Sequence, residues 1–352
     1  MKNCKYTEIA QDIEKDIGEN YSDKDMYLSI SQLKAKYSVS LDTVNKAFLI
    51  LEKKGLLTRQ HGKGTFVNKE DFRKISVLIL STYNVATLEK WGYIRETLTG
   101  IYSYLNNRQI NISFNTYTNI ENNPNILSEY DGVILLSPQL KQQNVLKIIK
   151  NRLIPSVITM SRYNNGINVV DSDIISASKN ILDYLKAMGH RKIGYIGDIS
   201  NQSNYHDLKR REIYFNYSEE IGLETKEEWS VIADATTVCD HTLKRIQELS
   251  AQNGPTAYFI TSFEYTIPKF LDRFFRIKHN ETPKLSITGF DKPFWEMFVT
   301  YELSSAEQNY RQVGSEAIKQ LINLIRKGEE SKSDTVIIPI VFHKGKTVFP
   351  LK

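Results

Sequence analysis

Short apolar runs alternate with segments of helical periodicity from residue 75 to the end of the chain. The runs are ISVLIL, INISFN, DGVILL, PSVITM, RKIGYIG, TAYFIT, KLSITGF and TVIIPIV. Helices are expected at residues 87–107, 139–152, 173–188, 236–251 and 309–327. Apolar strands separated by helices are typical of a parallel sheet, and ligands bind such sheets at the carboxyl ends of the strands. The alternation therefore predicts an α/β fold with parallel sheets, either as one large sheet or as two similar lobes.

A different pattern occupies the first 68 residues, so two domains are expected. A chain of 352 residues exceeds what one hydrophobic core usually organises. The segment between the two patterns is almost entirely polar, which is typical of a linker. The predicted organisation is a small domain at residues 1–68, a linker at 69–74 and a large domain at 75–352.

Three amphipathic helices and a hairpin are predicted for the small domain. Isoleucines at every fourth position indicate a first helix that ends near Gly18. Ser29 can cap the second helix, SISQLKAKY, and the third, LDTVNKAFLILEKKG, follows a short turn and stops at Gly55. Two β-prone runs, LLTRQ and TFVN, flank a tight basic tip. The pattern predicts a winged helix-turn-helix.

DNA binding is the favoured function of this domain. A short turn between two helices lets the second present its first residues to the major groove, while a basic hairpin can reach the backbone or the minor groove. The net charge of +5 is mild, but residues 41–69 carry six lysines and arginines against two acidic residues. A small helical adaptor is the alternative, because helix-turn-helix units also occur in proteins that never contact DNA.

The segment VSLDTVNKAFLILEKKGLLTRQHGKGTFV resembles the signature of GntR-family regulators. The resemblance covers about residues 5–68. It implies that DNA is contacted by the start of the second helix, by the start of the third, or recognition, helix and by the tip of the wing. The implied DNA-binding residues are Ser29, Ser31, Ser40, Asp42, Thr43, Asn45, Lys46, His61, Gly62, Lys63 and Gly64.

The chain departs from this family at positions that commonly read bases. Family members often have arginine where this chain has Ser31, Leu41 and Asn45. Arginine paired with guanine is the commonest specific contact in the major groove. The operator is therefore expected to depend less on guanine contacts, and Asn45 is a candidate reader of adenine.

Five motifs of the large domain resemble, in order, the effector domain of LacI/GalR regulators, which is related to periplasmic sugar-binding proteins. They are YDGVILLSP, IPSVITMSR, LKAMGHRKIGYIG, SITGFD and SSAEQNYRQVG. The resemblance covers about residues 75–350 and implies two lobes joined by crossing strands. The first lobe would hold residues 75–172 and 305–328. The ligand would lie in a cleft between the lobes.

The LacI/GalR resemblance also implies effector-binding residues. Asp291 follows a Gly-aromatic strand end, although it could instead cap a helix, and Gln308 could instead satisfy backbone groups at a crossover strand. The family's arginine falls at Arg210 or Arg211, and its acidic residue at Asp171 or Asp173. An apolar Phe263 would suit a deoxy-sugar or a more apolar ligand. The implied set is Tyr93, Asp173, Arg210, Arg211, Phe263, Asp291 and Gln308, with Asp171 as the alternative to Asp173.

A GntR head joined to a LacI-like body resembles the arrangement of arabinose-repressor-type regulators. The resemblance implies a homodimeric transcriptional regulator that binds operator DNA and represses carbohydrate-utilisation genes until a sugar closes the lobes. One alternative is a cytoplasmic solute-binding protein with a non-functional DNA-binding head. The intact GKGTFV wing disfavours this alternative.

Nothing in the sequence predicts an enzyme, a cofactor or a metal. We find no nucleophile–base arrangement, phosphate loop or metal-ligand spacing, nor a segment typical of a pyridoxal-phosphate lysine. His190 lies in a Gly-His-Arg turn that usually packs a helix end against the next strand. An enzyme on an α/β scaffold with a regulatory head remains a further alternative.

The sequence favours a cytoplasmic protein without a membrane segment. No run approaches the roughly 20 apolar residues of a membrane helix. The N-terminus lacks the apolar core and cleavage site of a secretory signal. The two cysteines, Cys4 and Cys239, lie far apart in different predicted domains, which disfavours a disulfide framework.

Overall fold

The computed structural model describes residues 5–53, 55–68, 75–84, 92–105, 110–198, 204–233, 238–261, 285–291, 302–327 and 333–351. The chain divides into two units, residues 1–77 with 102–113 and residues 78–101 with 114–352. The division crosses strands β3 (Ile75–Ser81) and β4 (Ile110–Thr116). The linker predicted at 69–74 lies outside the described residues, so the predicted domain boundaries stay predictions. Among the described helices, none has the length and apolar character to cross a membrane.

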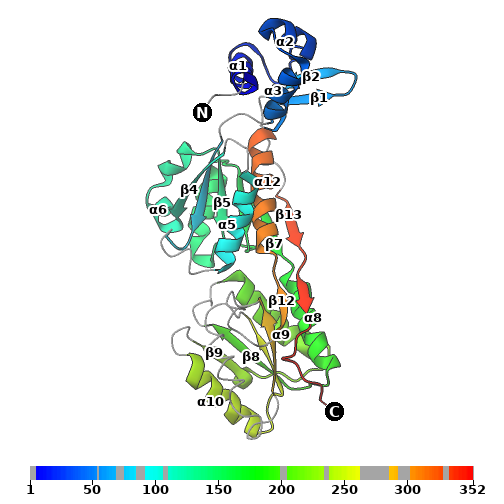
Figure 1. Ribbon diagram of the computed structural model, residues 1–352. Coiled ribbons are helices and arrows are strands. Elements are labelled where there is room, and N and C mark those ends of the chain that lie inside the picture. Colours follow the sequence, from blue (N-terminus) through cyan, green and yellow to red (C-terminus); the bar gives the residue numbers. More distant parts are fainter. Residues whose placement is uncertain are drawn as a thin grey trace. The chain divides into compact units, whose positions relative to one another are not determined.

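Three helices and a two-stranded wing form the N-terminal fold, as predicted (Figure 1). The elements are α1 (Lys5–Asn20), α2 (Ile30–Tyr37), α3 (Leu41–Lys53), β1 (Leu57–Gln60) and β2 (Gly64–Val67). Each helix buries an apolar face, and Ile13, Leu33 and Phe48 are fully enclosed in the shared core. The chain leaves α3 at Gly55, whose φ of 81° is one that residues with a side chain rarely adopt.

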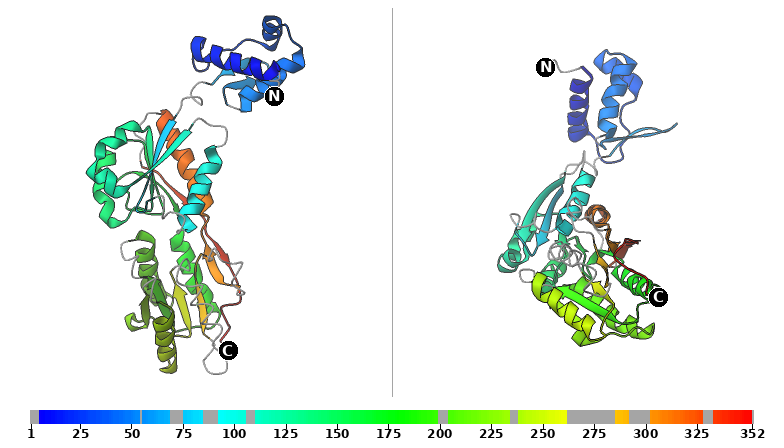
Figure 2. Two further views of the ribbon diagram at one scale, coloured as in Figure 1. Left: turned by 60° about the vertical axis from the view of Figure 1, so that its left-hand side comes forward. Right: turned by 60° about the horizontal axis from the view of Figure 1, so that its bottom comes forward.

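The wing is anchored by the segment that precedes α2. The amide of Lys24 donates to the carbonyl of Val67 at 2.8 Å, and the amide of Tyr27 donates to the carbonyl of Thr65 at 2.8 Å. Met26 therefore pairs with Phe66 of β2 in an isolated antiparallel bridge. Figure 2 shows the hairpin of β1 and β2 extending away from the three helices. The anchoring fixes the direction of the wing relative to the helix bundle.

The first lobe is a six-stranded sheet in the order β13-β7-β6-β5-β3-β4. Its remaining strands are β5 (Gly132–Leu136), β6 (Ser156–Thr159), β7 (Asn168–Ser172) and β13 (Thr335–Ile338). Helices α6 (Tyr117–Asn122) and α7 (Gln143–Asn151) bury their apolar sides in the core on one face. Helices α5 (Gly92–Leu105) and α12 (Tyr310–Lys327) lie on the other face (Figure 1).

The second lobe repeats this plan with a sheet in the order β14-β12-β11-β10-β8-β9. Its strands are β8 (Ile193–Asp198), β9 (Ser230–Ala233), β10 (Ala257–Ile260), β11 (Ser286–Phe290), β12 (Ser304–Glu307) and β14 (Val341–His343). All pairings are parallel except that of β14 with β12. Helices α8 (Ile174–Ala187) and α9 (Tyr205–Glu220) pack in the core of one face, and α10 (Val238–Ala251) in that of the other.

The chain passes between the lobes after β7, after β12 and after β13. The predicted α/β fold with parallel sheets in two lobes is therefore confirmed, whereas the lobe assignment is wrong in two places. Residues 305–307, predicted for the first lobe, belong to β12 in the sheet of the second, and the C-terminal end was also misassigned. The run TVIIPIV divides at Pro339, because proline cannot donate to a sheet ladder. Its first part, β13, returns to the sheet of the first lobe, and β14 joins that of the second.

Two glycines bring α5 and α12 into backbone contact. A Cβ atom on Gly314 would lie 2.0 Å from the carbonyl oxygen of Thr97, and one on Gly100 would lie 2.0 Å from the carbonyl oxygen of Arg311. We expect Gly314→Ala to lower the free energy of unfolding by about 1–3 kcal/mol, because the helices must move apart. Thermal and urea unfolding measure the change.

Gly18→Ala provides the matched control for this prediction. Gly18 lies within α1, and a Cβ atom there would have no neighbour within 4 Å. This variant is expected to be more stable than wild type by up to about 1 kcal/mol, because alanine favours helix more than glycine does. A stabilising Gly314→Ala would contradict the close packing of α5 and α12.

Candidate functional site

The start of α3 is held by a network of short side chains. The amide of Thr43 donates to Oγ of Ser40 at 3.2 Å, and the two hydroxyl oxygens lie 2.8 Å apart. Nζ of Lys46 lies 2.7 Å from a carboxylate oxygen of Asp42, one turn earlier on the helix. Ser40 thus satisfies a free amide of the first turn in the manner of an N-cap. Leu41, the first residue of the helix, is exposed.

Asn45 faces the wing from the next turn of α3. Its Oδ1 accepts from Nη1 of Arg59, a residue of β1, at 3.4 Å. Nε of Arg59 lies 2.8 Å from a carboxylate oxygen of Glu52, and the guanidinium lies over the ring of Phe48. Arg59 therefore ties the wing to α3. Reading adenine requires both polar atoms of the Asn45 amide, so this prediction demands that Arg59 release Oδ1.

The remaining predicted DNA-binding residues occupy the start of α2 and the tip of the wing. The hydroxyl of Ser29 accepts from the amide of Gln32 at 3.3 Å, and the Gln32 side chain accepts from the amide of Ser29 at 2.8 Å. This capping box confirms the predicted N-cap. The exposed residues are Ser31 in α2 and His61, Gly62, Lys63 and Gly64 in the wing.

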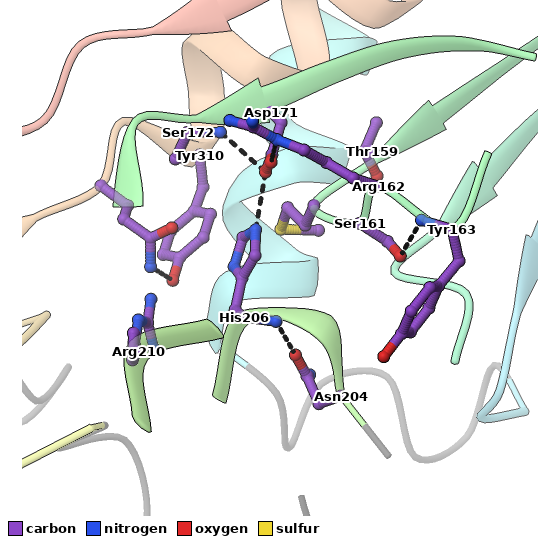
Figure 3. Close-up of polar contacts among 12 residues, drawn as sticks. Thr159, Ser161, Arg162, Tyr163, Asp171, Ser172, Asn204, His206, Arg210 and Tyr310 are labelled. Atoms are coloured by element: carbon purple, nitrogen blue, oxygen red, sulfur yellow. Dashed lines mark hydrogen bonds and ion pairs between the residues drawn. The ribbon is translucent and has the colours of Figure 1, made fainter. Parts of the chain in front are cut away.

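A buried carboxylate joins the two lobes. Asp171, at the end of β7, is 0% exposed. Its Oδ2 accepts from Nε of Arg162 at 3.0 Å, and its Oδ1 lies 2.6 Å from Nε2 of His206 on α9. Figure 3 shows His206 pointing from its helix toward this carboxylate, which Arg162 also reaches. Burial alone would raise the pKa of Asp171, but His206 and Arg162 outweigh it and hold the pKa below its usual value of 3.8.

Arg210 lies one turn beyond His206 on α9 and is 3% exposed. Nη1 donates to the carbonyl of Thr261 at 2.7 Å, and the guanidinium lies 3.9 Å from the ring centre of Phe290. Within the described part of the chain, Nε and Nη2 have no hydrogen-bond partner. These two N–H groups form one edge of the guanidinium, the arrangement that pairs with two oxygen acceptors at once. Arg210 therefore offers a buried donor pair that no described residue uses.

The neighbouring Arg211 has a different environment. It forms an ion pair with Glu227, and its side chain is 38% exposed. Its guanidinium also lies over the ring of Phe215. The sequence left the choice between the two arginines open, and the structure places only Arg210 among the polar groups at the strand ends.

Asp291 and Gln308 form a second polar group where β12 leads into α12. Nε2 of Gln308 donates to Oδ2 of Asp291 at 2.9 Å and also to the hydroxyl of Tyr310. The Tyr310 hydroxyl donates to the same Asp291 oxygen at 2.7 Å. Among the described residues, Oε1 of Gln308 finds no partner. The ring of Tyr93, on α5, lies 6.1 Å from that of Tyr310.

Two predicted effector residues are not part of this arrangement. Oδ1 of Asp173 accepts from the amide of Ser176 at 3.1 Å and caps α8. Asp171, the alternative to Asp173, is the acidic residue that lies with His206 and Arg162. Asp171 therefore fits the predicted role better than Asp173. Phe263 lies outside the described residues.

Sequence reasoning missed several members of the site. Arg162, His206 and Tyr310 were not predicted, and they bind the carboxylates of Asp171 and Asp291. His206 and Arg210 are four residues apart and share one face of α9. That spacing is the signal that could have identified the pair, although apolar periodicity alone did not predict α9.

His190 has the structural role that the sequence favoured, which is to pack the end of a helix against the next strand. It is fully buried, Nε2 lies 3.1 Å from the carbonyl of Phe349 and Nδ1 lies 2.9 Å from the hydroxyl of Thr256. Since a carbonyl only accepts, Nε2 carries the proton of the neutral ring. Burial lowers the pKa of His190 below 6.5, although the bond to Phe349 opposes this shift.

This lowered pKa gives stability a dependence on pH. The unfolded chain takes up the His190 proton first as pH falls, so stability is complete above about pH 6.5 and declines below it. We expect the free energy of unfolding of His190→Asn to fall less between pH 7.5 and pH 5.5 than that of the wild type. Each unit of pKa lowering corresponds to about 1.4 kcal/mol. Urea unfolding at the two pH values tests this, and an unchanged decline in the variant would contradict it.

Two family models match the chain. Residues 5–67 match the family of bacterial regulatory proteins called gntR, and residues 182–348 match the periplasmic binding protein-like domain. The first match spans the three helices and the wing. The second spans most of the second lobe together with α12 and β13 of the first.

Solved structures share the fold of most of the chain. A LacI transcriptional regulator from Bacillus cereus subsp. cytotoxis superposes with a TM-score of 0.67 at 20% identity, over 80% of this chain and 100% of that one. The transcriptional regulator CelR in complex with cellobiose gives 0.65 at 17% identity, over 88% and 91%. A LacI family regulator from Enterococcus faecium with bound ribose gives 0.60 at 15% identity, over 79% and 100%.

Proposed function

We propose that this chain is a transcriptional regulator in which a sugar bound by the region that matches the periplasmic binding protein-like domain controls the operator affinity of the region that matches the gntR family. The protein is a homodimeric repressor of carbohydrate-utilisation genes. It acts in the cytoplasm, where its operator lies, and requires no cofactor.

The predicted DNA-binding residues support operator recognition. They occupy the capped start of α3, the start of α2 and the tip of the wing, and Arg59 links the wing to α3. A rigid unit of this kind can place a helix in the major groove while its wing contacts the backbone. A dimer is part of the proposal, because two heads are needed to read two half-sites.

The unused donor pair of Arg210 carries the effector proposal. Sugars present adjacent hydroxyl oxygens, and Nε and Nη2 of Arg210 can donate to two such oxygens in parallel. Burial makes unpaired donors costly, so a ligand that satisfies them gains affinity. Asp291 and Gln308 add acceptors for sugar hydroxyls, and Tyr93 adds an aromatic surface. The cellobiose and ribose bound by two similarly folded regulators support a sugar as the ligand class.

The position of these residues supports control by lobe closure. Asp171 ends β7, from which the chain enters the second lobe, and Gln308 follows β12, from which the chain returns. A sugar held by groups of both lobes favours the closed arrangement. In a dimer, closure changes the spacing of the two heads and weakens operator binding, so sugar relieves repression.

Fluorescence anisotropy tests the proposal. A labelled DNA fragment from immediately upstream of the protein's own gene cluster is titrated with the full chain at fixed salt, then with pentoses, hexoses and deoxyhexoses. We expect tight binding that one sugar reverses. Tight binding that no sugar changes would contradict the effector class, and sugar binding without any DNA binding would favour a solute-binding protein with a non-functional head.

A further inference from the structure

The first turn of the recognition helix α3 displays an apolar side chain to solvent. Leu41 is the first residue of the helix and is 53% exposed. The apolar residues that hold α3 in the domain, Val44, Phe48 and Leu51, are by contrast fully buried. Leu41 therefore contributes little to the core of the domain, and its exposed surface is available to a partner.

The polar side chains around Leu41 already have partners inside the domain. The hydroxyls of Ser40 and Thr43 lie within hydrogen-bond distance of each other, and Ser40 also caps the helix. Asp42 and Lys46 form an ion pair with each other. Oδ1 of Asn45 accepts from Arg59. These contacts hold the polar side chains in place within the domain, whereas Leu41 has no polar atom to satisfy and presents its exposed apolar surface directly to a base edge.

The edges of base pairs in the major groove carry one apolar group, the C5 methyl of thymine. A leucine on the first turn of a groove-bound helix fits this methyl and no polar edge. We infer that Leu41 is a specificity residue, which reads a thymine in each half-site through the C5 methyl group of that base. This inference rests on the proposed operator binding. The operator is thereby specified by an apolar contact at a position where an arginine would select guanine.

Removing a single methyl group from the DNA tests this inference. Binding to the full-length chain first enriches preferred duplexes from a random DNA pool. In the most strongly enriched duplex, each thymine is then replaced in turn by deoxyuridine, which lacks only the methyl group. For the wild-type chain, we expect one thymine per half-site at which the replacement weakens binding about three- to tenfold. For Leu41→Ala, the same replacement is expected to have no effect.

A matched control separates this contact from a general loss of apolar surface. Leu49 lies two turns further along α3 and is 51% exposed. Leu49→Ala is expected to keep the full sensitivity to deoxyuridine. Both alanine variants should unfold at the wild-type temperature, because each side chain is half exposed. Leu41→Arg is expected to move the preference at the same base pair from thymine to guanine.

The outcomes divide cleanly. The inference is overturned if the wild-type chain tolerates deoxyuridine at every position. It is also overturned if replacing the sensitive thymine by deoxyuridine weakens binding by Leu41→Ala as much as it weakens binding by the wild type. Enrichment of no sequence at all would instead overturn the proposed operator binding, and this inference with it.

Discussion

Arg210→Met is expected to bind operator DNA as the wild type does and to lose the response to sugar. Methionine keeps much of the volume but removes the guanidinium, which lies over the ring of Phe290 and carries the two N–H groups that have no hydrogen-bond partner among the described residues. A hydrogen bond from a charged donor contributes about 1.5–3 kcal/mol. Losing two of them should reduce the affinity for sugar by about 100-fold or more. Calorimetric titration of the sugar measures this loss.

Arg211→Met is the matched control for this experiment. It makes the same chemical change at the next residue, whose partners are Glu227 and the ring of Phe215. This variant should bind sugar with an affinity within about twofold of wild type, because the Arg211 side chain does not belong to the cluster of polar residues at the strand ends. Arg210→Lys should behave like Arg210→Met, since an ammonium cannot present two parallel donors. Equal losses in Arg210→Met and Arg211→Met would contradict the assignment of the ligand site.

Asp171→Asn is expected to lower the free energy of unfolding by about 3 kcal/mol at pH 7. The variant removes the negative charge that Arg162 and His206 share, and it leaves both groups without a charged partner. Breaking a buried ion pair from one side typically costs about 3–5 kcal/mol. The lower end applies because Arg162 is partly exposed. Urea unfolding measures the deficit.

The dependence of this deficit on pH follows from the pKa of Asp171. Since the folded-state pKa lies below 3.8, the carboxylate stabilises the fold above the unfolded pKa, and this stability is lost as pH falls through the folded pKa. The deficit of Asp171→Asn is therefore expected to shrink below about pH 4. Asp173→Asn is the control, because asparagine caps a helix as well as aspartate does. A similar deficit in both variants would contradict the role of Asp171.

The N-terminal fold was predictable because its determinants are local. Isoleucines at helical spacing, the cap at Ser29 and the stop at Gly55 each act within a few residues of the chain. The structure has all three helices and the hairpin close to the predicted positions. The anchoring segment at residues 24–27 was not predicted, because it bonds to a strand some 40 residues away and carries no periodicity of its own.

The elements that build the candidate ligand site were the hardest to predict. Helix α9 carries a buried face of His206, Arg210, Ile213, Tyr214 and Ser218, which has few aliphatic residues. Strand β12 buries Ser304 and Ser305, and β7 buries Asp171. Periodicity of apolar residues cannot find elements whose buried side chains are polar, and such departures are expected at functional sites. The choice between Arg210 and Arg211 depends on the rotation of α9, which tertiary packing sets.

Calorimetric titration of the identified sugar, with and without saturating operator DNA, tests the central claim most directly. Control of operator affinity by sugar is a coupling between two sites, and such coupling is reciprocal. If sugar weakens operator binding by a given factor, the operator must weaken sugar binding by the same factor. The account predicts equal factors in the two directions. The same affinity for sugar in the presence and absence of operator would contradict it.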